Sequence, residues 1–294
     1  MRRVPVVLLL ALLGTAERPC HAVVTHNRLA GNRLAGNRLA GNRLAGNRLA
    51  GNRLSTNGLE ADMSTAGELL STPEGRELYA YVISCALPSG TTIEATIPGA
   101  PDSGPGTGND TPYTCTSERC VFGGGINLAP RWINRKLTRT GQRWVSACLF
   151  ARVNLYDTAE SISLRGSHEA LAVFVDEAEL YPLEEGAFYG QAFTDLDQPI
   201  GWFACRGEAQ AAGESGGLIL RDCTEPDPND PAHTLCGFNF AGDCASYSPA
   251  SPAYACQVRD AARTFYDKCH ERPGPGKWPR IKRYREVITV FVAK

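Results

Sequence analysis

CRGEAQAAGESGGLILRDCTEPDPNDPAHTLCGFNFAGDCASYSPASPAYACQVRDAARTFYDKC, residues 205–269, contains six cysteines separated by short apolar runs and by turns rich in Gly, Pro and Asp. Such a segment offers few of the large apolar side chains that build a core, so cross-links must hold its shape. We therefore predict a disulfide-stapled module over 200–270, and we expect the rest of the folded chain to pack around it.

The first 22 residues have the pattern of a secretory signal peptide, because a short positive region at 1–3 precedes the apolar run 4–13. Small residues follow the apolar run, and they allow cleavage before Glu17 or before Val23. Cleavage before Val23 removes Cys20 and leaves ten of the eleven cysteines, an even number. A lipid attached to Cys20 is the alternative. We expect an exported protein, in the periplasm, on the outer surface or outside the cell.

No later segment is long and apolar enough to form a transmembrane helix.

The ten remaining cysteines are expected to form disulfides, as is usual for an exported chain. Cys85 and Cys148 both face inward on predicted helices and could pair, but sequence alone leaves the connectivity open. The ten residues are Cys85, Cys115, Cys120, Cys148, Cys205, Cys223, Cys236, Cys244, Cys256 and Cys269.

Charge divides the chain into two unlike parts. Residues 1–54 hold nine arginines and a single acid, Glu17, which leaves 21 basic and 30 acidic residues in 55–294. A cationic arm therefore precedes an acidic body. The acidic balance of the body argues against nucleic-acid binding by the folded part.

The arm, residues 23–63, is built on the unit Asn-Arg-Leu-Ala-Gly, which occurs five times over 27–51 and then decays. A period of five gives no apolar stripe on a helix or a strand, so the arm is predicted to be a flexible cationic tether. A β-solenoid with one repeat per side is the alternative. The arm could bind an anionic surface polymer through Arg28, Arg33, Arg38, Arg43, Arg48 and Arg53.

Residues 64–294 are predicted to form one α+β domain, disulfide-rich, with mostly antiparallel strands and about three helices. The Thr, Pro and Glu at 72–74 predict a helix start, and the Pro-Ser-Gly at 88–90 predicts its end. A hairpin is expected between Cys115 and Cys120. Further strands are predicted at 91–97, 161–164, 171–175, 200–205, 218–221 and 287–292, further helices at 141–155 and 258–268, and a short helix with a loop over 177–193.

Ser215 lies in Gly-Glu-Ser-Gly-Gly, which fits the Gly-x-Ser-x-Gly pattern of a hydrolase nucleophile. His233 and His270 follow it, as the order of a hydrolase triad requires. A glycine-rich turn between two strands is the simpler interpretation, and we favour it because no buried strand leads directly into Ser215.

Two acidic regions could carry other chemistry. Calcium could bind the loop formed by Glu225, Asp227, Asn229 and Asp230, although its prolines favour a rigid solvated turn. Acidic and aromatic residues over 176–193 could form a carboxylate pair or a sugar platform, or could belong to the core. No cofactor is expected, and no Cys-x-x-Cys pair indicates zinc.

Two short motifs carry a resemblance, Phe-Ala-Cys-Arg-Gly at 203–207 and Cys-Gly-Phe-Asn-Phe-Ala-Gly-Asp-Cys at 236–244. With the arm, they resemble cysteine-rich exported proteins of myxobacteria that carry Asn-Arg-Leu-Ala repeats near the N-terminus. The first motif also resembles the family named for its Ala-Asp-Tyr-Cys motif, in place of which this chain has Gly242-Asp243-Cys244. The resemblance implies export and disulfides and supplies no activity.

These patterns favour an exported, non-enzymatic protein of the cell envelope or extracellular space with a structural or interaction role. A secreted serine hydrolase using Ser215 and a carbohydrate-binding module are the two alternatives. The sequence does not indicate an oligomeric state.

Overall fold

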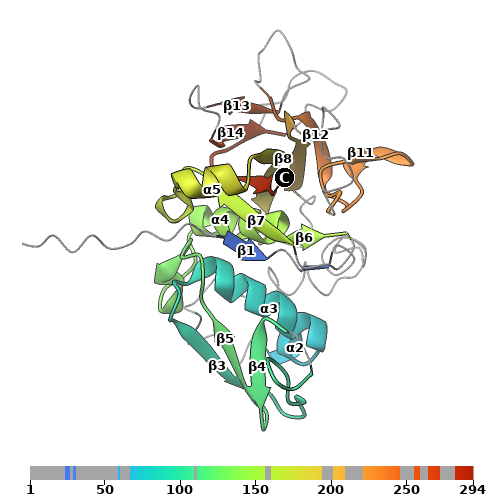
Figure 1. Ribbon diagram of the computed structural model, residues 1–294. Coiled ribbons are helices and arrows are strands. Elements are labelled where there is room, and N and C mark those ends of the chain that lie inside the picture. The colour runs from blue at the N-terminus through green and yellow to red at the C-terminus, as the bar shows by residue number, and fades with distance from the viewer. Residues whose placement is uncertain are drawn as a thin grey trace, which may run out of the picture.

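The computed structural model describes residues 24–26, 29–30, 59, 67–108, 111–155, 160–193, 201–208, 221–245, 255–258, 264–271 and 282–293 (Figure 1). These residues form an α+β fold with mostly antiparallel sheets and five disulfides, which confirms the predicted fold class. No helix in the described ranges is long and apolar enough to cross a membrane.

The two long helices begin at capping threonines. Thr72 accepts a hydrogen bond from the Gly75 amide at 3.1 Å, and Pro73 occupies the first helical position of the helix that follows. Thr138 caps the next long helix through the Gly141 amide, also at 3.1 Å. The α-helices are α2 (Gly67–Leu70), α3 (Pro73–Ala86), α4 (Arg139–Ala151) and α5 (Val175–Leu180), with 3-10 turns η2 (Pro130–Ile133) and η3 (Glu169–Leu171).

One sheet of eight strands organises the larger part of the structure, in the order β1-β7-β16-β8-β9-β12-β11-β10. All neighbours pair antiparallel except β9 and β12, which are parallel. Its strands are β1 (Val24–His26), β7 (Ser161–Arg165), β8 (Leu183–Gln191), β9 (Gly201–Arg206), β10 (Pro226–Asp227), β11 (Asp230–Thr234), β12 (Asn239–Asp243) and β16 (Val287–Val292).

A second sheet, in the order β3-β5-β4, lies against α3 (Figure 1). Its strands are β3 (Thr92–Thr96), β4 (Tyr113–Thr116) and β5 (Arg119–Gly123). Exposed and buried residues alternate along β3, as the β-branched pattern of the sequence predicts. The β4–β5 hairpin pairs Cys115 with Cys120 directly across the ladder, where the two form a disulfide.

A third sheet, β13-β14-β15, contains the described residues 258 and 266–268 of the predicted helix 258–268, so that prediction is wrong where the structure describes it. Its strands are β13 (Cys256–Val258), β14 (Tyr266–His270) and β15 (Arg283–Tyr284). Cys256 lies opposite Cys269 in the β13–β14 ladder and is bonded to it, so pairing and cross-link override the helical spacing of the sequence. The strand predicted at 171–175 is also wrong, since η3 ends at Leu171 and α5 begins at Val175.

The region predicted as a short helix with a loop contains α5 and, beyond it, the buried strand β8. Strand β8 was not predicted from the sequence, and it contains a bulge. Val290 pairs with Gly186 and Phe291 with Glu184, so Glu185 is an extra residue in the β8–β16 ladder. Residues 184–190 of β8 are all buried, so exposed and buried residues do not alternate along it.

Two hydrophobic clusters fill the structure. The larger one joins α3 and α4 to one face of the eight-stranded sheet, through residues such as Phe150, Phe188 and Ile288. The smaller cluster lies on the other face, beneath β13 and β14, and contains Tyr189, four cysteines and their neighbours. The cysteine-rich module therefore contributes to both clusters, since Trp202 and Phe238 belong to the larger one. Its strands β9–β12 form one side of the eight-stranded sheet.

Two short strands come from the predicted arm. β1 (Val24–His26) pairs with β7 at the edge of the large sheet, and β2 (Leu29–Ala30) pairs parallel with β6 (Val153–Asn154). Leu59 is buried, and its amide donates to the Trp132 carbonyl at 2.9 Å. Both ends of the repeat segment therefore contact the folded domain. The predicted signal segment 1–22 and the six arm arginines lie outside the described residues.

Candidate binding groove

A groove of about 430 Å³ forms where three segments far apart in the sequence meet. Helix α4 supplies one side of it, the β7–η3 connection the second and the β15–β16 turn the third. The lining residues are Thr140, Trp144, Ser167, His168, Glu169, Arg285 and Glu286. This hollow combines an indole, an imidazole, hydroxyls and charges of both signs, which are groups that can stack against a ligand or form hydrogen bonds with it.

Gly166 allows the groove to form. A Cβ on Gly166 would lie 2.7 Å from the Val287 carbonyl oxygen and 3.5 Å from the Trp144 ring. Only a glycine therefore lets the β7–η3 connection approach both β16 and α4 so closely. That approach places His168 edge-to-face against Trp144, with ring centroids 5.3 Å apart.

His168 is a neutral donor in this arrangement. Its Nδ1 accepts a hydrogen bond from the Ala170 amide at 3.2 Å, which caps η3 and assigns the ring proton to Nε2. Burial lowers the pKa of His168, and the neighbouring Glu169 opposes that effect in part. At neutral pH the ring therefore adds a hydrogen-bond donor to the groove and no charge.

The opposite wall is held from beneath by Arg143. Its guanidinium lies 3.4 Å from the Glu286 carboxylate and 5.1 Å from the centroid of the Tyr284 ring. Both ionic side chains are largely buried, so this contact fixes Glu286 more firmly than a surface pair would. Arg285 and Glu169 are exposed and complete a rim that carries both signs of charge.

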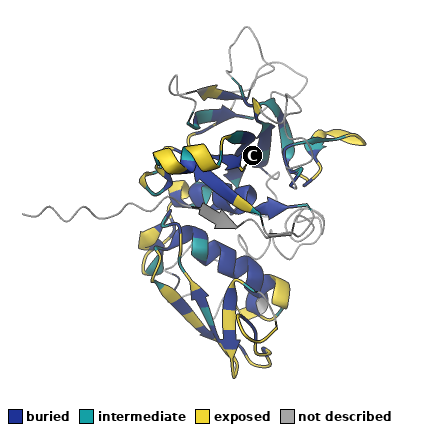
Figure 2. Cartoon of the chain, in the orientation of Figure 1, coloured by how far each residue is buried: buried dark blue, intermediate teal, exposed yellow. Residues whose placement is uncertain are grey.

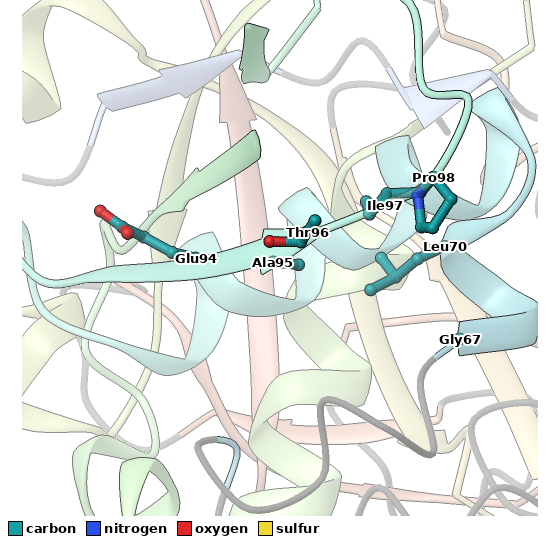
Figure 3. Close-up of a pocket in the computed structure, with 7 residues that line it drawn as sticks. All are labelled: Gly67, Leu70, Glu94, Ala95, Thr96, Ile97 and Pro98. Atoms are coloured by element: carbon teal, nitrogen blue, oxygen red, sulfur yellow. The ribbon is translucent and has the colours of Figure 1, made fainter. Parts of the chain in front are cut away.

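A smaller pocket of about 180 Å³ lies between α2 and the edge strand β3 (Figure 3). Leu70, Ala95 and Ile97 give it an apolar lining, and Glu94 is its single charged residue. The pocket gathers no set of polar groups. We therefore regard the larger groove as the better candidate.

The hydrolase residues are not brought together among the residues that the structure describes. Ser215 lies in 209–220, outside them. His233 is on strand β11, with Nδ1 2.8 Å from Asp230 Oδ2, while His270 is buried on β14 in a different sheet. Burial lowers the pKa of His270, and Arg283 and Lys268 lower it further.

The acidic loop proposed for calcium forms the β10–β11 hairpin, whose tip is exposed (Figure 2). Its carboxylates have other partners. Glu225 lies 3.8 Å from Arg206, Asp227 accepts from the Asn229 amide at 2.8 Å, and Asp230 pairs with His233. In the described ranges, the side chains of this loop do not gather into a metal-binding group.

The acidic and aromatic residues of 176–193 belong mainly to the interior. Phe188 and Tyr189 are fully buried, so they are core residues and form no sugar platform. Glu177 accepts a hydrogen bond from Ser163, and Glu184 accepts one from the Tyr266 hydroxyl at 2.7 Å. Glu185 forms a buried ion pair with Arg221 at 3.1 Å.

All ten predicted disulfide cysteines are paired and buried. The pairs are Cys85–Cys148, Cys115–Cys120, Cys205–Cys244, Cys223–Cys236 and Cys256–Cys269. Within the described chain, a single group of three potential metal ligands lies close together, namely Cys205, Cys256 and Cys269. Their sulfurs are engaged in disulfides and so are not thiolate ligands in this state.

Comparison with known proteins gives no relative. No protein-family model matches the chain, and neither the curated proteins nor the solved structures give a significant match. We therefore infer function from the chemistry of the groove and of the cysteines.

Proposed function

We propose that this chain is an exported protein that acts by binding, at the cell envelope or outside the cell. The five disulfides are the observation that supports export most directly, because cytosolic thiols are kept reduced. One buried cross-link joins α3 to α4, one joins β9 to the residue after β12, and three lie within or beside the β4–β5, β10–β11 and β13–β14 strand pairs. They would keep a binding surface in shape outside the cytoplasm.

The groove supplies that surface, and its chemistry favours a saccharide. Sugar hydroxyls both donate and accept, which suits a rim that carries Glu169, Arg285 and two hydroxyl side chains. A strongly charged ligand would meet repulsion from one sign or the other. The predicted carbohydrate-binding alternative thus moves from 176–193, where Phe188 and Tyr189 are buried, to the groove at Trp144 and His168.

A binding assay with matched variants tests this proposal. Arg285→Ala and Glu169→Ala remove exposed side chains that line the groove, and both should preserve the fold. Arg283→Ala is the control, since Arg283 is also exposed but does not line the groove. A glycan array should give a ligand whose affinity falls at least about tenfold in the groove variants and stays unchanged in the control. Equal binding by all four proteins would contradict the proposal.

Binding of an anionic surface polymer by the arm is a separate prediction. Its six arginines could hold the protein on an anionic surface polymer in a salt-dependent way. Deleting residues 27–54 should then release the protein from cells at low salt. Salt-insensitive retention that survives the deletion would rule out this contact.

The hydrolase alternative has a separate test. A fluorophosphonate probe should leave the purified protein unlabelled if the protein acts by binding. Labelling that disappears in Ser215→Ala would overturn the binding proposal in favour of a secreted serine hydrolase.

A further inference from the structure

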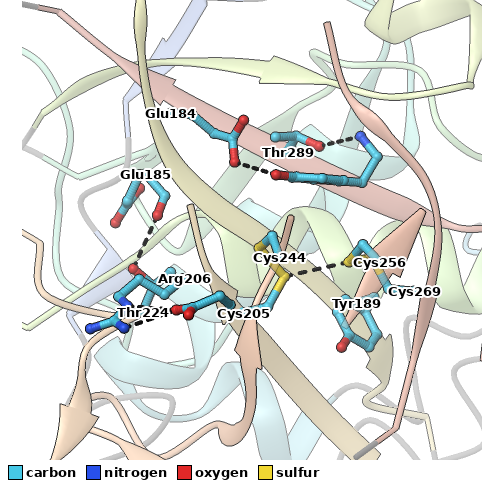
Figure 4. Close-up of a disulfide and its surroundings, with 12 residues drawn as sticks. Glu184, Glu185, Tyr189, Cys205, Arg206, Thr224, Cys244, Cys256, Cys269 and Thr289 are labelled. Atoms are coloured by element: carbon cyan, nitrogen blue, oxygen red, sulfur yellow. Dashed lines mark hydrogen bonds and ion pairs between the residues drawn. A yellow bond between two sulfur atoms is a disulfide. The ribbon is translucent and has the colours of Figure 1, made fainter. Parts of the chain in front are cut away.

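Two disulfides touch each other beneath the third sheet. Cys205–Cys244 joins β9 to the residue after β12, and Cys256–Cys269 joins β13 to β14. The Sγ atoms of Cys205 and Cys256 lie 3.5 Å apart, which is van der Waals contact between sulfurs (Figure 4). The Sγ atoms of Cys205, Cys256 and Cys269 all lie within 4.8 Å of one another.

Contact of this kind has a chemical consequence, because disulfides exchange when a thiolate attacks a disulfide sulfur. We propose that Cys205, Cys244, Cys256 and Cys269 form an internal thiol–disulfide exchange site with two interchangeable pairings. An external dithiol first reduces Cys256–Cys269 and is itself oxidised to a disulfide. The Cys256 thiolate then attacks Cys205, a Cys205–Cys256 bond forms, the Cys205–Cys244 bond breaks, and Cys244 leaves as a thiolate.

Burial favours the internal reaction over external ones. All four cysteines are completely buried, within a cluster that includes Ala187, Tyr189 and Tyr266. The external dithiol reaches such sulfurs only when the structure around them opens locally. Once Cys256–Cys269 is reduced, the neighbouring Cys205 sulfur is already in place and has a high effective concentration. Apolar surroundings also raise the pKa of a thiol, so exchange should become faster as the pH rises toward and above about 8.5.

The new pairing would change what the cross-links connect. In the present pairing, one disulfide lies within the eight-stranded sheet region and the other lies within the three-stranded sheet. Cys205–Cys256 would instead tie β9 of the first sheet to β13 of the third. Exchange would thus alter the coupling between these two sheets. It would leave two free thiols, Cys269 from the reduction and Cys244 from the exchange.

A single substitution starts the reaction without a reductant. Cys269→Ser leaves Cys256 as a free thiol in contact with the Cys205–Cys244 disulfide. After incubation at pH 8, the protein is unfolded in guanidinium at pH 6 with excess N-ethylmaleimide, and the label is located by peptide mass spectrometry. We expect label on Cys244 and a peptide linked through Cys205–Cys256. Label on Cys256 alone would overturn the proposal.

Cys120→Ser is the matched control. It also breaks a cross-strand disulfide and leaves one thiol, Cys115, but in the described structure no second disulfide touches that pair. Its label should remain on Cys115. Label that spreads to other cysteines in this control would show general scrambling, and the same spread in Cys269→Ser would then not support a specific site.

Limited reduction of the wild-type protein keeps the proposal testable if Cys269→Ser does not fold. Dithiothreitol is added until species with two new thiols appear, and these are trapped and mapped as before. Label on Cys244 and Cys269 together with a Cys205–Cys256 link is expected. Two-thiol species in which every surviving disulfide keeps its original partner would contradict the proposal.

Discussion

Glu185 shows how burial changes the role of a charged residue. It lies on β8 with no exposed surface, and its carboxylate is 3.1 Å from the buried guanidinium of Arg221. Burial raises the pKa of Glu185 and lowers that of Arg221, while the ion pair opposes both shifts. Neither charge can be removed alone without leaving the other in the core.

We therefore expect Glu185→Leu and Arg221→Met to lower the free energy of unfolding by about 3–5 kcal/mol each. The double variant should recover most of that loss, since it buries no charge. Guanidinium denaturation of the oxidised protein measures all three. Single variants that lose less than about 1 kcal/mol would show that the pair is better hydrated than its burial indicates.

His168 predicts a pH dependence. Its pKa in the folded protein is lowered by burial, so the folded state binds fewer protons than the unfolded state below about pH 6.5. The stability that comes from its neutral form is therefore present above pH 6.5 and is lost as the pH falls. His168→Gln should lose less stability than the wild type between pH 7 and pH 5, measured as the shift in denaturation midpoint. Equal losses would contradict the assigned protonation state.

At the scale of elements, the β8 bulge depends on Gly186. A Cβ there would lie 2.2 Å from the Cys205 carbonyl oxygen, and the backbone φ is +159°. Neighbouring strand backbone cannot move aside easily, so Gly186→Ala should cost more than about 2 kcal/mol of unfolding free energy. Gly123→Ala on β5 is the control, because nothing lies within 4 Å of its Cβ position. Similar stability for both variants would contradict the requirement for glycine at position 186.

Elements with local signals were predictable from sequence. Helix α3 has its capping Thr72 and Pro73, and β3 and β16 are β-branched and lie between turns. Strand β8 was not predictable, because it is buried on both faces, shows no alternation and has two glutamates in its first half. Strand β14 was misread because Phe265 and Tyr266 also suit a helix, and only pairing with β13 decides between the two.

The groove lay beyond sequence reasoning for a different reason. Trp144, His168 and Arg285 each belong to a separate element, and no spacing along the chain shows that the three meet. The one available signal was Gly166 directly before a polar loop, which indicates a close backbone approach only once the neighbours are known. The ten paired cysteines, by contrast, were predictable from their number and the apparent signal peptide, although most of their pairings were not.

At the scale of the whole molecule, the disulfides join distant parts of the chain. Cys85–Cys148 closes a separation of 63 residues between α3 and α4, whereas Cys115–Cys120 closes only 5. Loop-closure entropy predicts about 4 kcal/mol from the first and about 2 kcal/mol from the second. Replacing both cysteines of each pair by alanine and comparing denaturation midpoints tests this order. A larger loss from the short hairpin pair would contradict it.

Export and disulfide bonding are tested together by the mass of the protein recovered outside the cytoplasm, before and after reduction and alkylation. We expect a chain that starts at Val23 and takes up ten alkyl groups only after reduction. Peptide mapping should then give the five pairs found in the structure, apart from exchange within the four-cysteine site. Free thiols in the native protein, or a retained signal segment, would contradict an exported, disulfide-stabilised binding protein.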